Sequence, residues 1–324
     1  ITDNDFQNAS PYVFGSATPQ IILPGSFIAN MPGNRGQSPA VAGYNNKLYV
    51  FGGKYAGGDP GPYSTHDTFV VYDTETNSWS SPTSKMSVKR AGVYGAIWQD
   101  KVYIYSGGLS GVDPQQTMEI YDIGNNQFLS IDTPDKRTSY AAGAINGKIY
   151  ICGGVQSGMG NSIISYDTST GSFEENLTSP PHSFMQHAAA VYNNKLYVMG
   201  GSLVTKENSL YVYDPNVGVG GTWGSLAPMP AERFGLKAVT LGSYIYAVGG
   251  AFGGSNHKTV FRYDPALDEW STETPMLNAR WNFGLGVANN AIFAVGDFRK
   301  DGERISVVEP PEEVAPEGAF EAVA

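Results

Sequence analysis

Cysteine and histidine are scarce in this chain of 324 residues, which contains one cysteine and four histidines. A single cysteine excludes an internal disulfide framework. The histidines, His66, His182, His187 and His257, do not have the spacing of a zinc or non-haem iron motif. The sequence therefore indicates neither a metal site nor a bound cofactor. Cys152 ends the apolar segment 149–152, so we expect a small buried hydrophobic side chain there.

Charge is also scarce, because charged residues make up 15% of the chain and the formal net charge is −10. A chain with this negative charge lacks the basic surface that attracts nucleic acids or anionic membranes, so we expect neither partner. No run of about 18 apolar residues is present, so we expect no membrane insertion. The low charge and Ile1 at the first position favour a processed chain that is secreted or held at a cell surface.

Glycine, in contrast, is abundant, with 40 residues, and hydrophobic residues make up 41% of the chain. This composition is typical of many short strands joined by tight turns. It excludes a disordered chain, because there is enough apolar surface to form a core. The composition therefore favours a folded protein rich in β-structure.

Internal repeats give the strongest signal. An apolar run that ends in glycine recurs at intervals of 46 to 55 residues, with first glycines at Gly52, Gly107, Gly153, Gly200, Gly249 and Gly296. A second glycine follows in every copy except the last, where Asp297 takes its place. A strand buried on both faces reads as a continuous apolar run, so each copy predicts a central strand. The glycines permit backbone angles that a side chain would disfavour.

Two further marks accompany the glycines. An alternating segment ends in Tyr-Asp, and an aromatic residue follows six or nine positions after the Asp: Tyr72-Asp73 with Trp79, Tyr121-Asp122 with Phe128, Tyr166-Asp167 with Phe173, Tyr213-Asp214 with Trp223, and Tyr263-Asp264 with Trp270. Each repeat also opens with a basic residue before a run of small and apolar residues: Arg35, Arg90, Arg137, His182, Arg233 and Arg280. Because these three features recur in a fixed order, the repeats are not a chance similarity.

The double glycine, the Tyr-Asp pair and the spaced tryptophan resemble the kelch repeat, and the resemblance covers residues 20–309. Four short strands in a repeat of roughly 47 residues form one propeller blade. We therefore predict an all-β fold, a six-bladed β-propeller with four antiparallel strands per blade. Small-residue runs such as 141–144 suit inner strands that crowd around an axis, and the spaced aromatic residues suit the wedge between blades.

The last repeat is incomplete, and the N-terminal part of the chain supplies what it lacks. Residues 305–309 stand in the place of the Tyr-Asp strand, with no aromatic residue after them. We expect residues 20–34, with a strand at 20–23, to close the last blade as its outer strand and to remove the open edge. Residues 1–19 are expected to form a polar tail. The acidic tail 310–324 is either a solvated linker or an arm for self-association.

The basic residues that open the repeats should lie at one mouth of the central channel. The kelch resemblance implies that arginines here face a bowl that binds a carboxylate, a sulfate or an acidic peptide. The alternative, given equal weight, is that Arg35, Arg90, Arg137, His182, Arg233 and Arg280 brace blades through backbone carbonyls. Tyr55 and Phe252, in loops after the glycines, and Trp281, which could stack on a sugar or peptide, complete the candidate binding residues.

Three functions are compatible with the sequence. The first is a non-catalytic extracellular binding module that recognises a protein or an acidic glycan through the channel mouth. The second is a structural building block that assembles through its terminal tails. The third is a secreted carbohydrate-active enzyme of epimerase or lyase type, with Glu232 as the acid–base residue. Family precedent alone supports the third, so the sequence favours a non-catalytic protein and leaves the enzyme as an alternative.

Overall fold

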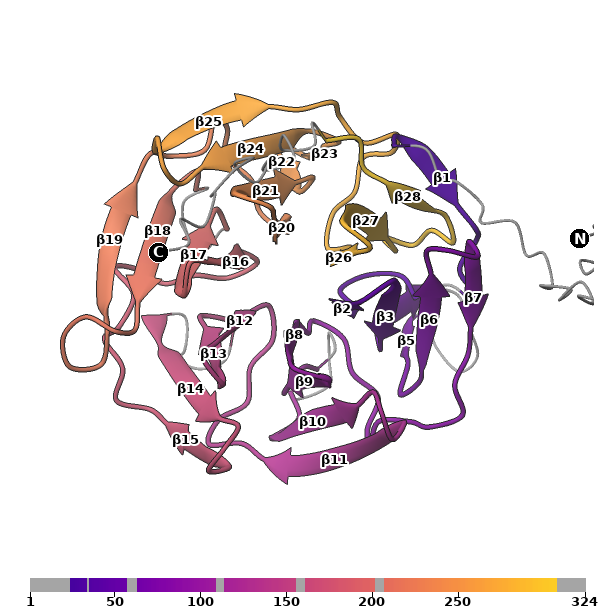
Figure 1. The fold of residues 1–324 in the computed structure, drawn as a ribbon, viewed down its shortest axis with the longest axis horizontal. Helices are drawn as coiled ribbons and strands as arrows, with labels where there is room; N and C mark the ends of the chain where they lie inside the picture. Colours follow the sequence, from indigo (N-terminus) through magenta and orange to yellow (C-terminus); the bar gives the residue numbers. More distant parts are fainter. Residues whose placement is uncertain are drawn as a thin grey trace, which may run out of the picture.

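The computed structural model describes residues 24–33, 35–56, 63–108, 114–155, 161–201 and 207–307. Six four-stranded antiparallel sheets are arranged as blades around a central axis (Figure 1). The prediction of an all-β, six-bladed propeller is confirmed. Within these ranges, no helix has the length and apolar character that crossing a membrane requires.

The blades follow one another along the chain, and each strand order below runs from the axis outward. Blade 1 contains β2 (Ala40–Tyr44), β3 (Lys47–Phe51), β6 (Phe69–Asp73) and β7 (Ser78–Ser80). Blade 2 contains β8 (Gly95–Trp98), β9 (Lys101–Tyr105), β10 (Thr117–Asp122) and β11 (Gln127–Asp132). Blade 3 contains β12 (Ala141–Ile145), β13 (Lys148–Cys152), β14 (Ile163–Asp167) and β15 (Ser172–Glu174).

The second half of the ring repeats this order. Blade 4 contains β16 (Ala188–Tyr192), β17 (Lys195–Met199), β18 (Leu210–Asp214) and β19 (Thr222–Leu226). Blade 5 contains β20 (Lys237–Leu241), β21 (Tyr244–Val248), β24 (Val260–Asp264) and β25 (Glu269–Thr272). Blade 6 contains β26 (Gly284–Ala288), β27 (Ala291–Val295), β28 (Gly302–Arg304) and β1 (Ser26–Ile28). Two short hairpins, β4 (Lys54–Ala56) with β5 (Tyr63–Thr65) and β22 (Ala251–Phe252) with β23 (Ser255–Asn256), lie in the loops of blades 1 and 5.

The innermost strands carry small residues because neighbouring blades approach closely at the axis. A Cβ atom added to Gly43 in β2 would lie 1.6 Å from the carbonyl oxygen of Val287 in β26. A Cβ atom added to Gly143 in β12 would lie 2.5 Å from a methyl carbon of Val191 in β16. Glycine is thus required where the backbones of adjacent inner strands meet.

The core consists of layers between adjacent blades. The second strand of each blade is buried on both faces, as its continuous apolar run predicted. Leu48 and Val50 of β3, for example, pack in one cluster with Phe293 and Val295 of β27 in the neighbouring blade. Cys152 at the end of β13 is fully buried as expected, and burial raises the pKa of its thiol to about 12.

The Tyr-Asp pairs and the spaced aromatic residues form a repeated unit at the rim. The ring centroids of Tyr72 and Trp79, which are cross-strand partners, lie 5.1 Å apart, and the same pair in the other four blades lies at 4.9 to 5.0 Å. Asp73 accepts hydrogen bonds from the backbone amides of Glu75 and Thr76 and so fixes the turn between the two strands. Nε1 of Trp79 donates to the carbonyl oxygen of Ala29, which connects blade 1 to blade 6.

The N-terminal part of the chain closes the ring, as predicted, because β1 pairs with β28 as the outer strand of blade 6 (Figure 1). The strand lies at Ser26–Ile28, a few residues beyond the 20–23 segment expected, and residues 20–23 lie outside the described ranges. Its partner is Gly302–Arg304 rather than 305–309, because the ladder to β27 begins at the pair Val295 and Gly302. The tails 1–19 and 310–324 lie outside the described residues.

Candidate functional site

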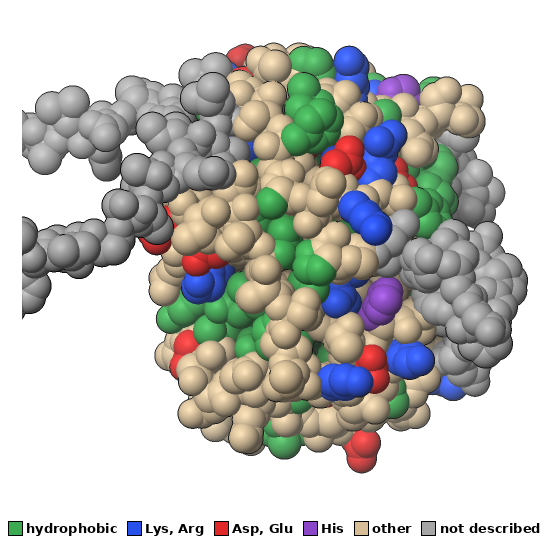
Figure 2. Space-filling model, turned by 90° about the vertical axis from the view of Figure 1, so that its right-hand side faces the viewer, with side chains coloured by type: hydrophobic (Ala, Val, Ile, Leu, Met, Phe, Trp, Pro, Cys, Tyr) green, Lys and Arg blue, Asp and Glu red, His purple; other side chains and the backbone are tan. Residues whose placement is uncertain are grey.

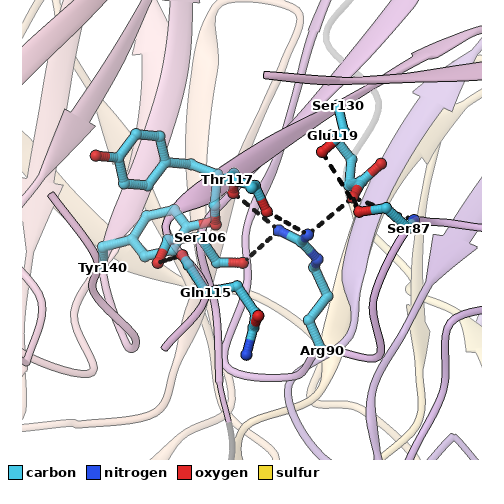
Figure 3. A network of polar contacts seen from close by, with 9 residues as sticks. Ser87, Arg90, Ser106, Gln115, Thr117, Glu119, Ser130 and Tyr140 are labelled. Atoms are coloured by element: carbon cyan, nitrogen blue, oxygen red, sulfur yellow. Dashed lines mark hydrogen bonds and ion pairs between the residues drawn. The ribbon is translucent and has the colours of Figure 1, made fainter. Parts of the chain in front are cut away.

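Arg90 enters blade 2, and its guanidinium group points into that blade (Figure 3). Nη1 donates to the carbonyl oxygens of Ser106 and Thr117 at 2.6 and 3.0 Å. Nη2 donates to Oγ1 of Thr117 at 3.0 Å and to Oε1 of Glu119 at 2.9 Å. Both members of the Arg90–Glu119 ion pair are fully buried. Burial lowers the pKa of Arg90, and the negative charge of Glu119 opposes that shift. The guanidinium group of Arg90 thus makes its hydrogen bonds within its own blade.

Other arginines of the set repeat this arrangement. Nη1 of the arginine donates to the carbonyl oxygen of the residue that follows the second strand in three further blades: Arg35 to Gly52, Arg137 to Gly153, and Arg280 to Gly296. A carboxylate accompanies two of them, because Arg280 pairs with Glu303 at 3.0 Å and Arg137 pairs with Asp135. The neighbouring carboxylate therefore comes from different positions in different blades.

Arg233 is held differently. Its Nη1 donates to the carbonyl oxygen of Glu232 at 2.7 Å, and its guanidinium carbon lies 5.7 Å from the ring centroid of Phe261. No ion pair is present for Arg233 among the described residues. Glu232, the residue considered for acid–base chemistry, is half-buried, and its contact with Arg233 is made by its backbone.

One interpretation of the sequence expected the arginines to present their guanidinium groups at the channel mouth. In the structure these groups are buried instead. The exposed fraction of all five lies between 0 and 6%. Their side-chain contacts fit the alternative, bracing through backbone carbonyls, although these contacts lie within one blade rather than between blades. Their own carbonyl oxygens make the link between blades, as when the amide of Gly53 donates to Arg90 at 3.0 Å. Anion binding by the arginines stays a prediction, and it would require these contacts to break.

Phe184, not His182, occupies the equivalent position in blade 4. The amide of Gly154 donates to the carbonyl oxygen of Phe184 at 2.9 Å, just as the amide of Gly250 donates to Arg280 at 2.9 Å. His182 lies two residues earlier, half-buried, with its ring centroid 4.5 Å from that of Phe184. An aromatic stack thus replaces the arginine in this blade.

A ring of backbone hydrogen bonds surrounds the mouth of the channel at the end where the six inner strands begin. Six residues, one per blade, each donate an amide to the preceding member and accept from the next at 2.5 to 3.1 Å: Ser38, Gly92, Ser139, Gln186, Gly235 and Asn282. All six have a positive φ, between 49° and 67°. We call this ring the annulus. Because its amides and carbonyls are satisfied within the ring, side chains must provide any polar contact to a ligand here.

Aromatic side chains lie beside the annulus in blades 5 and 6. The rings of Phe234 and Trp281, which precede Gly235 and Asn282, meet edge to face at 6.3 Å between centroids. Phe252 lies in β22, next to Ala251, which pairs with Phe234 across an isolated bridge. Of the predicted binding residues, Trp281 and Phe252 are therefore half-exposed near the mouth. The side chain of Tyr55 lies outside the described part of the chain.

The central channel forms a cavity of about 270 Å³ lined by all six inner strands. Its wall consists mainly of Ala, Gly and Val, and Lys237 at the start of β20 is the charged residue that lines it. Nζ of Lys237 lies 3.6 Å from the ring centroid of Tyr94, which belongs to the blade on the opposite side of the ring. These two side chains cross the channel beneath the annulus. The sequence did not single out either residue.

Charges on the rest of the surface are mixed. On the side of the molecule that Figure 2 shows, acidic and basic side chains lie among uncharged ones and do not gather into a field of one sign. Exposed pairs such as Lys148 with Glu174, at 2.9 Å, contribute to this pattern. Among the described residues, no group of three or more His, Cys, Asp or Glu side chains is placed to hold a metal ion.

Comparison with known proteins agrees with the repeats and the ring. The family model described as the KLHDC2/KLHL20/DRC7 Kelch-repeats domain matches residues 12–179 and 129–297. The chain belongs to the kelch-repeat family. Mouse Kelch-like protein 9 is 33% identical over 90 residues, which are 26% of this kelch chain and 15% of that protein. Zebrafish (Danio rerio) Kelch-like protein 38 is 32% identical over 117 residues, or 36% of this chain and 18% of that protein.

The solved structure titled "Structure of YjhT" shares the fold. Its TM-score is 0.67 at 15% sequence identity, and the match covers 83% of this chain and 92% of that one. The kelch chain matches less than a fifth of the length of the curated relatives named above. Kelch propellers generally serve as protein-interaction modules, and this chain has that architecture.

Proposed function

We propose that this kelch propeller binds a segment of a partner protein on the face that carries the annulus. The observation that supports the proposal is the composition of the mouth. Four half-buried polar side chains, those of Ser38, Ser139, Gln186 and Asn282, surround the axis, and the aromatic side chains of Phe234 and Trp281 lie beside them in blades 5 and 6. Loops on a rigid scaffold are where propellers carry their specificity.

The division of the mouth favours an extended peptide over a sugar. On the side of blades 5 and 6, Phe234 and Trp281 offer an apolar edge to a hydrophobic side chain of the ligand. On the opposite side, Ser139 of blade 3 offers a hydroxyl group to the ligand backbone. The arginines contribute by holding the mouth in shape rather than by touching the ligand. Their buried guanidinium groups support this role.

The finer aspects of the function are proposals of the same kind. Secretion or location at a cell surface, an acidic glycan as ligand, and assembly through residues 310–324 rest on the sequence alone. The contacts of Glu232 give no specific support to an epimerase or a lyase. We therefore keep protein binding as the proposed function.

The test is a selection of peptides from a displayed random library, followed by affinity measurement on purified variants. Trp281→Ala combined with Gln186→Ala is expected to weaken the selected peptide at least about tenfold, because an aromatic anchor is worth 1.4 kcal/mol or more. The matched control is Leu267→Ala, which removes a 66% exposed side chain from the β24–β25 turn on the opposite face. Equal affinity in the mouth variant and the wild type would refute the proposal.

A further inference from the structure

Lys237 is an unpaired amine inside the propeller. Its side chain is 9% exposed and lines the central channel as well as the small cavity under the annulus. Neither a hydrogen bond nor an ion pair joins Nζ to any described residue, and its contact is the face of Tyr94 at 3.6 Å. Buried lysines are ordinarily paired, so an amine left unpaired and directed into a cavity needs a reason.

The groups around Lys237 offer no counter-ion. The titratable side chains that line the small cavity with it are Tyr94, across the channel, Tyr140, whose hydroxyl donates to the carbonyl oxygen of Tyr105, and His187, from the segment that leads into β16. The hydroxyl of Tyr94 is engaged, because it donates to the carbonyl oxygen of His187 at 3.2 Å. The imidazole of His187 is buried, which lowers its pKa to about 3 and leaves it neutral. No acidic side chain lines the described channel wall or the small cavity, and the face of the Tyr94 ring is the cation–π partner of the ammonium.

We propose that Lys237 is a nucleophilic amine that captures a small aliphatic aldehyde in the central channel as an imine. The Nζ lone pair attacks the carbonyl carbon, and the addition product loses the carbonyl oxygen as water. The two amine hydrogens leave with that oxygen, a C=N bond remains, and no oxidant or reductant is needed. A short alkyl chain can pack against the Ala, Val, Leu and Ile side chains of the wall, which also contains Pro39, Tyr94 and Thr240.

The electronic state of the amine supports this chemistry. Burial lowers the pKa of Lys237 to about 7, so a large fraction of the amine is neutral near neutral pH and its lone pair is free. An exposed lysine, with its ordinary pKa near 10.4, is almost wholly protonated under the same conditions. The inner cavity of about 270 Å³ provides room for a short chain but not for a peptide. This ligand is therefore distinct from the partner proposed for the annulus face.

The experiment is reductive trapping of the full chain with butanal and cyanoborohydride at pH 7, followed by peptide mapping with mass spectrometry. We expect the N-butyl group to appear on Lys237 at least tenfold faster than on Lys258, an exposed lysine of the same blade. The preference should disappear in denaturant, where both amines are equivalent. Lys237→Met should lose the fast modification and keep the slow modification at Lys258.

The comparison of two lysines within one wild-type chain does not depend on whether the variant folds. A rate at Lys237 equal to or below that at Lys258 in the native protein would overturn the proposal. Fast modification that persists at Lys237 in denaturant would overturn it too, because the reactivity would then owe nothing to the channel.

Discussion

Replacing Glu119 by Gln tests whether the buried arginines brace the blades. The Arg90–Glu119 pair joins Nη2 and Oε1 at 2.9 Å with both side chains fully buried. Removing one charge from a buried pair leaves the other uncompensated, which costs about 3–5 kcal/mol in the free energy of unfolding. Arg90 keeps its bonds to Ser106 and Thr117, so we expect a loss near the lower end, about 3 kcal/mol.

The chain contains a control ion pair with the same N···O distance and different burial. The Lys148–Glu174 pair has the same separation, 2.9 Å, but the two side chains are 36% and 50% exposed. Exposed pairs are worth up to about 1 kcal/mol, so Glu174→Gln should have little effect. The assay is urea denaturation followed by tryptophan fluorescence, with the midpoint and the slope compared between the variants.

A third variant separates lost charge pairing from lost packing. Arg90→Met combined with Glu119→Leu replaces the pair with apolar side chains and should recover stability to within about 1 kcal/mol of the wild type or better. Equal losses for Glu119→Gln and Glu174→Gln would refute the reasoning. That result would mean that water reaches Arg90, as it would in an open ligand-binding mouth.

Three further predictions concern the channel, the axis and the closure of the ring. Between pH 7 and 10.5 the unfolded chain holds a proton on Lys237 that the folded chain has released, so the free energy of unfolding should rise by up to about 1.4 kcal/mol per pH unit. The same titration of stability on Lys237→Met should lack this slope. Gly43→Ala should destabilise the propeller by several kcal/mol in thermal unfolding, because the added Cβ would lie 1.6 Å from a carbonyl oxygen. Gly124→Ala, whose added Cβ would have no neighbouring atom nearer than 3.5 Å, should change the melting temperature little. Deletion of residues 1–30 removes β1 and the contact of Trp79 with Ala29, so calorimetry should show a lower melting temperature; an unchanged one would contradict closure through β1.

The sequence predicted the blades because each strand type leaves its own pattern of residues. Continuous apolar runs mark the second strands, and the Tyr-Asp pairs mark the third strands, where cross-strand partners such as Tyr72 and Trp79 must meet. Closure through the N-terminus followed from counting strands in the last repeat. The error there was a shift of a few residues, because the register of a short outer strand depends on its ladder rather than on its own composition.

The direction of the arginine side chains could not be predicted, because it depends on acceptors far along the chain. Arg90 turns inward since Thr117 and Glu119 lie 27 and 29 residues later and accept its hydrogen bonds. One signal was present: Glu119 stands between the apolar residues Met118 and Ile120, and a charge that is buried there needs a partner. The sequence took Gly107 as the first glycine of blade 2 and His182 as the basic residue of blade 4, but the structure places Gly107 as the second glycine and Phe184 in the place of the basic residue, for a similar reason. Ser106 adopts the positive φ, 42°, of a first glycine, and Phe184 replaces the arginine, so residue type alone misplaces both.

The annulus could not be predicted from the sequence, because residues of different types share its backbone conformation. Ser38, Gly92, Gln186 and Asn282 all adopt φ between 49° and 67°, and the ring of hydrogen bonds is what holds them there. A non-glycine residue in this region is strained by about 1 kcal/mol or more. The ring must therefore supply more stability than the strain removes.

Gln186 allows that balance to be measured. Gln186→Gly relieves the strain but makes the unfolded chain more flexible, so the free energy of unfolding should stay within about 1 kcal/mol of the wild type. Gln186→Val places a β-branched side chain at φ 51°, which should cost about 1–3 kcal/mol, either as lost stability or as a broken annulus. Urea denaturation measures both variants. If valine were tolerated as well as glycine, the hydrogen-bonded ring would not be fixing the backbone at this mouth, and the rigid face proposed for ligand binding would lose its physical basis.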